Sequence, residues 1–422
     1  MNMLRILLAN EIGREFKAAV SDSVLEQARV IVDRVRDSGE SAIREYASRF
    51  DERNADEPLV VGRDVMRAAF ESLSSEDQGV LIRTAQRIEV FACAQHDAIQ
   101  PMTVKISGGE TGHTIEPVGS AGCYAPAGRY PLPSSVLMTA ITARVAGCKR
   151  VVVASPGEDR FMLAAAHVAG ADEYLCVGGA HAIAAMAYGI DGFDRCDVVV
   201  GPGNAWVTAA KQLVSGVVGI DMLAGPSELM IIADESASVE ILATDLLAQA
   251  EHDIDAVPML LTTHPDSLDA IQYELERQLK SLPTAQTARE ALKNGFVVLC
   301  ENVDQAIELA DRTAPEHLQI CARDAQNIAD RVQNAGAVFI GEQSPEVMGD
   351  YGAGPNHTLP TGGTARFQAG LSVMHFLRLR TWIRIDEPAA FGPVASDMQR
   401  LAEMEGLWGH KNAVVARAER AS

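Results

Sequence analysis

Between about residue 130 and residue 340, the chain alternates short apolar runs with longer segments in which apolar residues recur at helical spacing. The apolar runs, which predict strands, are Val151–Ala154, Tyr174–Val177, Val198–Val200, Met230–Ala233, Met259–Leu261, Val297–Leu299, Leu318–Ile320 and Val338–Ile340. The segments that predict helices are Ser134–Ala146, Ala205–Val214, Val239–Ala250, Ser267–Leu279 and Asp324–Ala335. Apolar strands separated by crossover helices are typical of parallel sheets covered on both faces. The pattern predicts an α/β fold of two units that meet near Gly225.

The flanking segments have other periods. Residues 21–100 show helical spacing, with a break at Ser38-Gly39-Glu40, and residues 101–120 predict a hairpin that turns at Gly108 and Gly109. From about residue 371 the chain is expected to return to helix, with Ala395–Leu407 as its most periodic part.

Composition and charge narrow the classes of partner. A formal net charge of −21 over 422 residues disfavours nucleic acid and anionic membranes, because their phosphates would be repelled. The seven cysteines are scattered and form no Cys-x-x-Cys, which favours a reducing compartment over a disulfide framework. The apolar run at Met1–Ala9 is too short for a signal-peptide core, and Tyr174–Ile190 is too short for a membrane span.

One glycine- and proline-rich stretch, Gly349–Gly363, combines loop-forming residues with chemistry. Its glycines and prolines disfavour helix and central strand, so a loop is expected. The stretch carries a carboxylate, Asp350, and an imidazole, His357. Loops held by a rigid scaffold often carry sites, although a solvated turn is an equally good interpretation of this stretch by itself.

Three strand-end turns lie in the earlier α/β unit. Val199–Ala205 passes from an apolar strand through a glycine turn into a helix, an arrangement that places backbone donors where a phosphate binds well. A tight strand–helix turn without a ligand explains the same residues about as well. Val177–His181 and Gly122–Pro126 are the other two turns, and ligands of open sheets bind at strand carboxyl ends.

Several other side chains could carry chemistry. Gln249 and His252 lie three residues apart at a helix end, so an amide oxygen and an imidazole share one face, although an ordinary helix end is the stronger interpretation of this pair alone. Glu316 and His317 open a strand and could supply two general bases, although consecutive strand residues normally point to opposite sides. His410 is a lone histidine near the C-terminus. Gln249, His252, Asp350 and His410 form a donor set without thiolate, which suits a zinc ion that keeps room for substrate.

Over residues 20 to 415, the sequence resembles the histidinol dehydrogenase family. The motifs that carry the resemblance are Gly201-Pro-Gly-Asn204, Asp221-Met-Leu-Ala-Gly-Pro-Ser-Glu228, Asp245-Leu-Leu-Ala-Gln-Ala-Glu-His252, Ala314-Pro-Glu-His-Leu318, Gly349-Asp-Tyr to Leu359-Pro-Thr-Gly-Gly363, and Glu405-Gly-Leu to His410. The family oxidises L-histidinol to L-histidine with two NAD in succession, through an aldehyde that stays bound.

The resemblance implies a role for each matching residue. It implies catalysis by Glu316 and His317, with His317 also touching the substrate. The NAD contacts that it implies are Tyr124, the residue at His181, and Asn204. The remaining substrate contacts are Ser227, Gln249, His252, Asp350, Glu405 and His410, and the zinc ligands are Gln249, His252, Asp350 and His410. His357 could also contact the substrate near the metal, although a role in stabilising its loop explains it equally well.

The resemblance also implies an architecture and a location. The expected fold is two Rossmann-like α/β domains with mainly parallel sheets, plus small helical N-terminal and C-terminal elements. The expected boundaries are an arm at 1–20, a first α/β domain at 21–122 and 228–370, an NAD-binding second α/β domain at 123–227, and a tail at 371–422. The family members are homodimers in which the tail of one subunit completes the site of the other, and a cytoplasmic location is expected.

Some residues depart from the family pattern. His181 stands where the family usually has glutamine. Gly128-Arg129-Tyr130 and Arg380-Thr-Trp382 look more like a branch that acts on sulfopropanediol, and Arg129 could pair with a sulfonate. Another small polar alcohol is therefore the first alternative substrate. A two-lobed α/β binding protein without catalysis is the second alternative, and it would have no use for Glu316 beside His317.

Overall fold

The computed structural model describes residues 3–13, 19–127 and 131–421, so the expectation for Arg129 lies outside the described residues. The chain forms two units. The first comprises Met1–Ala94 and Val118–Phe376, and the second comprises Gln95–Pro117 and Leu377–Ser422.

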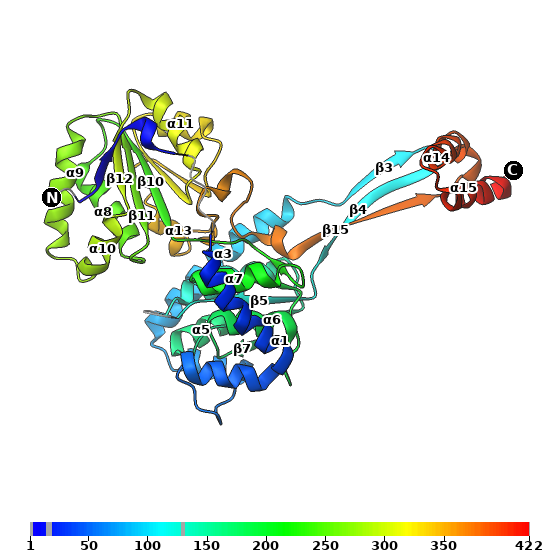
Figure 1. Cartoon of the computed structure of the whole chain (residues 1–422), viewed down its shortest axis with the longest axis horizontal. Coiled ribbons are helices and arrows are strands. Elements are labelled where there is room, and N and C mark those ends of the chain that lie inside the picture. The colour runs from blue at the N-terminus through cyan, green and yellow to red at the C-terminus, as the bar shows by residue number, and fades with distance from the viewer. Residues whose placement is uncertain (1–2, 14–18, 128–130, 422) are drawn as a thin grey trace. The chain divides into compact units, whose positions relative to one another are not determined.

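The first unit contains a six-stranded parallel sheet with the order β1-β12-β11-β10-β13-β14 (Figure 1). Its strands are β1 (Arg5–Leu7), β10 (Glu228–Ala233), β11 (Val257–Thr262), β12 (Phe296–Leu299), β13 (His317–Cys321) and β14 (Ala337–Ile340). The associated helices are α8 (Val239–Ala250), α9 (Ser267–Leu279), α10 (Ala285–Leu292), α11 (Val303–Thr313), α12 (Ala325–Arg331) and α13 (Val347–Asp350), with 3-10 turns at Ala9–Glu11, Thr364–Arg366 and Val373–Phe376.

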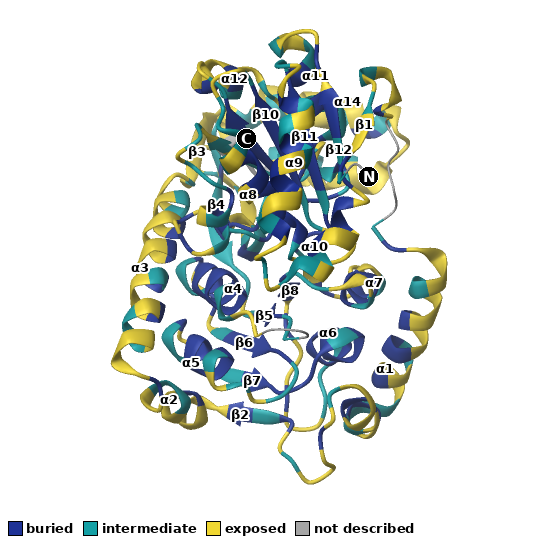
Figure 2. Cartoon of the chain, turned by 90° about the vertical axis from the view of Figure 1, so that its left-hand side faces the viewer, coloured by how far each residue is buried: buried dark blue, intermediate teal, exposed yellow. Residues whose placement is uncertain are grey.

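Both faces of the central strands of this sheet are buried, as their largely apolar sequences predict. Leu229 and Ile231 pack in the core formed with α8, α9 and α10, whereas Met230 and Ile232 pack in the core formed with α11 and α12. Figure 2 shows the resulting buried strands among helices whose outer faces are exposed. The expected N-terminal arm contributes β1, which pairs in parallel with β12.

A second six-stranded sheet in the first unit has the order β2-β7-β6-β5-β8-β9, parallel except for β2. Its strands are β2 (Val60–Gly62), β5 (Ser120–Tyr124), β6 (Arg150–Ala154), β7 (Glu173–Leu175), β8 (Val198–Val200) and β9 (Gly219–Ile220). Its helices are α1 (Asp22–Phe50), α2 (Arg63–Glu71), α3 (Ser75–Asp97), α4 (Pro133–Val145), α5 (Arg160–Val168), α6 (Gly179–Tyr188) and α7 (Ala205–Val214). In Figure 2, α4 and α5 lie on one side of this sheet, and α1, α6 and α7 lie on the other.

The sheets correct one expected boundary. Residues 21–122 were expected to join residues 228–370, but β2 pairs with β7, and β5 is central in the second sheet. The buried face of α1, including Ile31, Val35 and Ile43, packs in one core with Val152 and Ile183. Helical spacing identified α1 but contained no information about which sheet it covers. The expected break in this helix is confirmed, because Gly39 is non-helical with φ 54°.

The second unit is a three-stranded antiparallel sheet with two helices. Its elements are β3 (Met102–Ile106), β4 (Gly109–Pro117), β15 (Leu377–Ile385), a 3-10 turn (Pro388–Phe391), α14 (Gly392–Met404) and α15 (Trp408–Ala421). The predicted β3–β4 hairpin is confirmed, with Gly108 at φ 79°. The expectation of a wholly helical tail was wrong, because β15 pairs along the full length of β4.

The described part of the chain contains no helix that is both long enough and apolar enough to cross a membrane.

Candidate active site

Glu316 and His317 lie at the amino end of β13 and converge on one residue of the neighbouring strand. Glu316 Oε2 accepts a hydrogen bond of 2.8 Å from the backbone N–H of Glu228, and His317 Nδ1 lies 2.9 Å from the Glu228 carbonyl oxygen. Consecutive strand residues normally diverge, but Glu316 precedes the strand and follows Ala314, whose backbone is left-handed at φ 49°. The irregular turn therefore brings both side chains to the same edge, with His317 Nδ1 3.6 Å from Glu316 Oε2.

The surroundings give these two side chains different proton affinities. Burial lowers the pKa of His317 to about 4, so the ring is neutral near pH 7. A carbonyl oxygen can only accept, so Nδ1 carries the proton and Nε2 has the lone pair. Burial raises the pKa of Glu316 well above its usual value. The two residues are thus a neutral imidazole acceptor beside a carboxyl group that ionises only at raised pH.

Three of the expected metal donors lie in the first unit. His252 follows the end of α8, and its Nε2 is 3.1 Å from Asp350 Oδ2 at the end of α13. Gln249 lies one turn earlier on α8 and is fully buried. Among the described residues, neither its amide oxygen nor its amide nitrogen has a hydrogen-bond partner. A buried amide without a partner fits a side chain whose oxygen binds a cation, so these residues fit a zinc ion.

Glu346 is a site residue that the sequence analysis missed. A carboxylate oxygen of Glu346, one of Asp350 and a ring nitrogen of His252 all lie within 4.8 Å of one another. Glu346 Oε1 also lies 3.7 Å from His317 Nε2, so this carboxylate links the donor cluster with the acid–base pair. The four-residue spacing from Glu346 to Asp350 was the available signal, but it lies partly before the glycine-rich loop on which the prediction concentrated.

The charged groups of the donor cluster shift one another's pKa values. Burial alone would lower the pKa of His252, but the hydrogen bond and charge of Asp350 outweigh burial and raise it. Burial acts to raise the pKa of Asp350, yet the hydrogen bond from His252 and the nearby imidazoles lower it. Burial and the charge of Asp350 together raise the pKa of Glu346 to about 8. The cluster therefore holds a surplus of carboxyl groups over cations, as a cation site requires.

Two other expected substrate contacts lie in the first unit. Ser227 directly precedes Glu228 at the edge where Glu316 and His317 converge. His357 Nε2 is 3.5 Å from Ser135 Oγ on α4, and burial lowers the pKa of His357. A neutral His357 ring therefore joins the glycine-rich loop to the helices of the second sheet.

The expected cofactor residues gather at the carboxyl ends of the second sheet. Tyr124 ends β5, and its buried hydroxyl accepts a 3.0 Å hydrogen bond from the backbone N–H of Gly179. Asn204 caps α7, because its side-chain oxygen accepts from the N–H groups of Trp206 and Val207 at 3.1 and 3.2 Å. The turn that joins β8 to α7 packs tightly against Tyr124. A Cβ on Gly201, at φ 122°, would lie 2.0 Å from the Tyr124 carbonyl oxygen. The close approach explains why glycine stands there.

A buried ion pair fixes the turn at Gly201. Lys211 pairs with Asp221, and both side chains are almost fully buried. Lys211 Nζ also donates to the Gly201 carbonyl at 3.0 Å, and the Gly201 N–H donates to Asp221 Oδ2 at 2.8 Å. The Asp221 motif is recognisable in the sequence, but the sequence does not show that Asp221 and Lys211 hold the backbone of Gly201 in place.

His181 is internal. Its Nε2 is 2.8 Å from Asp51 Oδ2, the two side chains are 2% and 6% exposed, and the same oxygen accepts from the Gly178 N–H at 3.0 Å. The ring lies beside Tyr46 and Phe50, with centroids 6.0 and 6.1 Å away. Any effect of His181 on a cofactor is therefore expected to pass through the Gly178–Gly179 turn.

Glu405 and His410 belong to the second unit, where both are exposed: Glu405 follows α14 and His410 lies in the first turn of α15. Arg380, one of the residues that resemble the sulfopropanediol branch, lies on β15 and forms an ion pair of 2.9 Å with Glu116 on β4. That guanidinium therefore already has an anionic partner within its own sheet.

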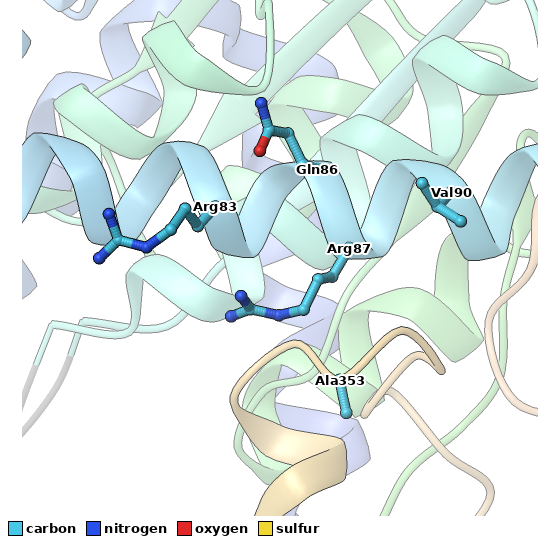
Figure 3. A pocket seen from close by; sticks show the side chains of 5 residues that line it. All are labelled: Arg83, Gln86, Arg87, Val90 and Ala353. Atoms are coloured by element: carbon cyan, nitrogen blue, oxygen red, sulfur yellow. The ribbon is translucent and has the colours of Figure 1, made fainter.

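A groove of about 350 Å³ lies between α3 and the loop that follows α13. Figure 3 shows its lining residues, Arg83, Gln86, Arg87 and Val90 on the helix and Ala353 on the loop. Arg87 Nε donates to the Gly352 carbonyl at 2.7 Å, which anchors the loop two residues after Asp350. The groove thus adjoins the loop that follows Asp350, one of the candidate metal donors.

Two mainly parallel sheets covered by helices, with the buried Glu316 and His317 beside a cluster of candidate metal donors, are typical of an α/β enzyme. A family model described as histidinol dehydrogenase matches residues 15–418. Histidinol dehydrogenase of Thermus thermophilus is 45% identical over 389 residues, 92% of this chain and 93% of that relative. Histidinol dehydrogenase of Prochlorococcus marinus is 45% identical over 396 residues, 92% of this chain and 89% of that relative.

A solved structure agrees with these matches. The crystal structure of histidinol dehydrogenase from Elizabethkingia anophelis matches with a TM-score of 0.92 at 31% identity, over 100% of this chain and 99% of that one. The chain belongs to the histidinol dehydrogenase family. The α/β fold with mainly parallel sheets and the family resemblance are thereby confirmed.

Proposed function

We propose that this protein oxidises L-histidinol to L-histidine by two successive hydride transfers through L-histidinal, as a zinc-dependent and NAD-linked enzyme. The observation that carries the proposal is the convergence of Glu316 and His317 on Glu228, with Glu346 linking His317 to the donors His252 and Asp350. Membership of the family supplies the substrate class.

Gln249, His252 and Asp350 would hold the zinc ion from the first unit, and His410 would be the fourth ligand. When bound, zinc supplies a positive centre that orients the imidazole and amine nitrogens of the substrate, and NAD accepts the hydride. Ser227, His357 and Glu405 would contact the substrate around this centre.

His317 is the base for the first oxidation. Its Nδ1–H is fixed on the Glu228 carbonyl, so its Nε2 lone pair accepts the hydroxyl proton of the alcohol as hydride departs. Because its pKa is lowered to about 4, the ring is unprotonated at neutral pH and is ready to act.

Glu316 is the base for the second oxidation. Its carboxylate takes a proton from a water that adds to the aldehyde, while protonated His317 returns its proton to the aldehyde oxygen. The resulting hydrate then loses a hydroxyl proton to His317 as the second hydride departs. The hydrogen bond from the Glu228 N–H holds one oxygen in place and leaves the other to meet the water. The aldehyde need not leave, because both bases lie at one edge of β13.

NAD would bind to Tyr124, to Asn204 and to the Gly178–Gly179 turn, which His181 supports through Asp51. Replacing His181 by alanine leaves the Asp51 carboxylate without its partner, so we expect the free energy of unfolding to fall by about 1–3 kcal/mol. NAD affinity should fall with it, because Asp51 also holds the Gly178 N–H. Thermal unfolding and NAD titration measure the two effects.

His181→Gln should restore most of both quantities, because its amide N–H can still donate to Asp51. His264→Ala, at a partly exposed loop position, should change neither. If His181→Ala bound NAD as tightly as the wild type, the Asp51–His181 pair would have no role in holding the turn that binds the cofactor.

We propose a homodimer in which the second unit of one subunit supplies Glu405 and His410 to the other, and a cytoplasmic location. The exposure of both residues on the second unit supports this assembly, since each is accessible to a partner.

The experiment that tests the proposed substrate compares kcat/KM for NADH formation with L-histidinol and with a sulfopropanediol. The Glu116–Arg380 ion pair favours histidinol, because it leaves that arginine less suited to a sulfonate. Turnover of the diol without turnover of histidinol would overturn the assignment. Saturable binding of histidinol without NADH formation would instead favour the two-lobed binding protein.

A further inference from the structure

An ion pair holds both backbone polar groups of Gly201. The N–H of Gly201 donates to Asp221 Oδ2 at 2.8 Å, and its carbonyl oxygen accepts from Lys211 Nζ at 3.0 Å. Lys211 and Asp221 also pair with each other, and their side chains are 3% and 0% exposed. Hydrogen bonds to charged groups are stronger than those between neutral groups, so the backbone of Gly201 is firmly held.

The turn that begins at Gly201 needs such a restraint. Gly201 directly follows β8, and the turn leads through Asn204 into α7. Glycine has more backbone conformations available than any other residue, and Gly201 adopts φ 122°, which other residues rarely adopt. The Lys211–Asp221 pair restricts this freedom, because it fixes the peptide groups on both sides of the Gly201 Cα.

The pair also ties α7 to the segment that follows β9. Lys211 lies on α7, and Asp221 directly follows β9. One turn earlier on the same helix, the hydroxyl of Thr208 donates to the Ala224 carbonyl oxygen at 2.7 Å. Thr208 is 2% exposed, so this second contact is also shielded from water. The segment is thus fixed to the helix that begins at the cofactor turn.

The same segment leads directly to the acid–base pair. It continues through Gly225, whose N–H donates to Thr361 Oγ1, and reaches Glu228. The backbone of Glu228 holds both Glu316 and His317. One short stretch of chain therefore sets the positions of the cofactor turn and of the two bases.

Stability alone does not explain the pair. Taking two charges out of water is costly, and apolar residues of similar volume often replace a buried ion pair at equal or higher stability. Apolar residues cannot supply an acceptor for the Gly201 N–H or a donor for its carbonyl oxygen. What the pair adds is therefore a defined conformation of the turn.

We infer that Lys211 and Asp221 are positioning residues, which hold the turn from Gly201 to Asn204 in the conformation that binds NAD. The inference rests on the proposed function, because it concerns the same cofactor. Both side chains are buried, so the pair acts through the backbone of the turn rather than by touching the dinucleotide. Without the pair, the turn would adopt the binding conformation for only part of the time, and the apparent affinity would fall by that fraction.

The test is the Kd for NAD of the full-length protein, measured by titration calorimetry together with thermal unfolding and the affinity for Zn2+ alone. Lys211→Met/Asp221→Leu removes both charges and both backbone contacts at similar volume, so it should unfold at the temperature of the wild type or higher. We expect its Kd for NAD to rise by about tenfold or more, as when a binding conformation is populated about a tenth of the time. Its Zn2+ affinity should not change, because α8 and α13, which carry candidate metal donors, belong to the other sheet.

Arg150→Met/Glu173→Leu is the matched control. These residues form an ion pair of 2.8 Å in the same sheet, but at the amino ends of β6 and β7, the edge opposite the cofactor turn. The NAD affinity of this control should equal that of the wild type. Lys211→Met/Asp221→Asn keeps an acceptor for the Gly201 N–H, so its Kd should lie between those of the wild type and Lys211→Met/Asp221→Leu.

The outcomes separate the two proposals. Failure of the wild type to bind NAD would contradict the proposed NAD dependence itself. NAD binding by Lys211→Met/Asp221→Leu as tight as that of the wild type would overturn only the positioning role. Equal losses of NAD and Zn2+ affinity would mean a general loosening of the fold and would also overturn it. If that variant does not fold, Lys211→Met/Asp221→Asn decides instead: a Kd for NAD equal to that of the wild type, at equal thermal stability, would overturn the inference.

Discussion

Replacing His317 by asparagine is expected to lower kcat for histidinol oxidation by about a hundredfold or more. The asparagine amide can still donate to the Glu228 carbonyl, so the local structure is retained, but no lone pair remains to accept the hydroxyl proton. The measurement is steady-state NADH formation at saturating histidinol and NAD, together with thermal unfolding.

His264→Asn is the control for His317→Asn, because His264 is a partly exposed loop histidine that should leave kcat unchanged. An unchanged melting temperature in His317→Asn, with the loss of turnover, separates a chemical role from a structural one. Turnover within a few fold of the wild type would remove His317 from the mechanism.

Replacing Glu316 by glutamine is expected to separate the two oxidations. Hydride transfer from the alcohol should continue, whereas oxidation of the aldehyde should slow by about a hundredfold, because no base activates the water. Rapid mixing with histidinol should therefore give a fast phase of about one NADH per site, followed by a slow phase.

The same variant tests the pH dependence. Burial raises the pKa of Glu316 well above its usual value, so its ionised, basic form increases as pH rises through that raised pKa. Aldehyde oxidation by the wild type should rise correspondingly with pH, and Glu316→Gln should lack this rise. Two fast NADH equivalents from Glu316→Gln would show that another group activates the water; the exposed Glu301→Gln serves as the control.

The fold was predictable where the spacing of apolar residues matches the faces that the element buries. Strands such as β6 and β8 have apolar residues on both faces, so their sequences predict parallel strands between helices, and helices α7, α8 and α9 were predicted with their observed bounds. β15 was missed although Leu377, Leu379, Ile383 and Ile385 alternate with polar residues, which is a strand period. The helical period of the residues that follow β15 led to a prediction of helix for the β15 residues as well.

The assignment of α1 shows a limit of another kind. The amphipathic pattern of α1 predicts that the helix packs on an apolar surface, but both sheets of this chain have such a surface. Only the pairing of the short strand β2 with β7 and the packing of α1 on α6 and α7 determine the choice, and these contacts join residues far apart in sequence.

The sequence offers candidate site residues one by one but does not say how they lie relative to one another. His252 and Asp350 were both predicted, and the structure shows their contact. For Glu316 and His317 the sequence left two possibilities open, because consecutive strand residues point to opposite sides unless the local turn is irregular. The left-handed backbone at Ala314 was the missing information, since alanine rarely adopts it and no sequence rule predicts it. Glu346 was missed because buried carboxylates are recognised by their surroundings rather than by a motif.

The central claim is that one site carries out both oxidations without releasing the aldehyde. The most direct measurement is the number of NADH formed per L-histidinol consumed by the zinc-loaded protein with excess NAD, with an aldehyde trap in solution. The account predicts two NADH and one L-histidine for each histidinol, with no trapped aldehyde. A single NADH with stoichiometric trapped histidinal would contradict it.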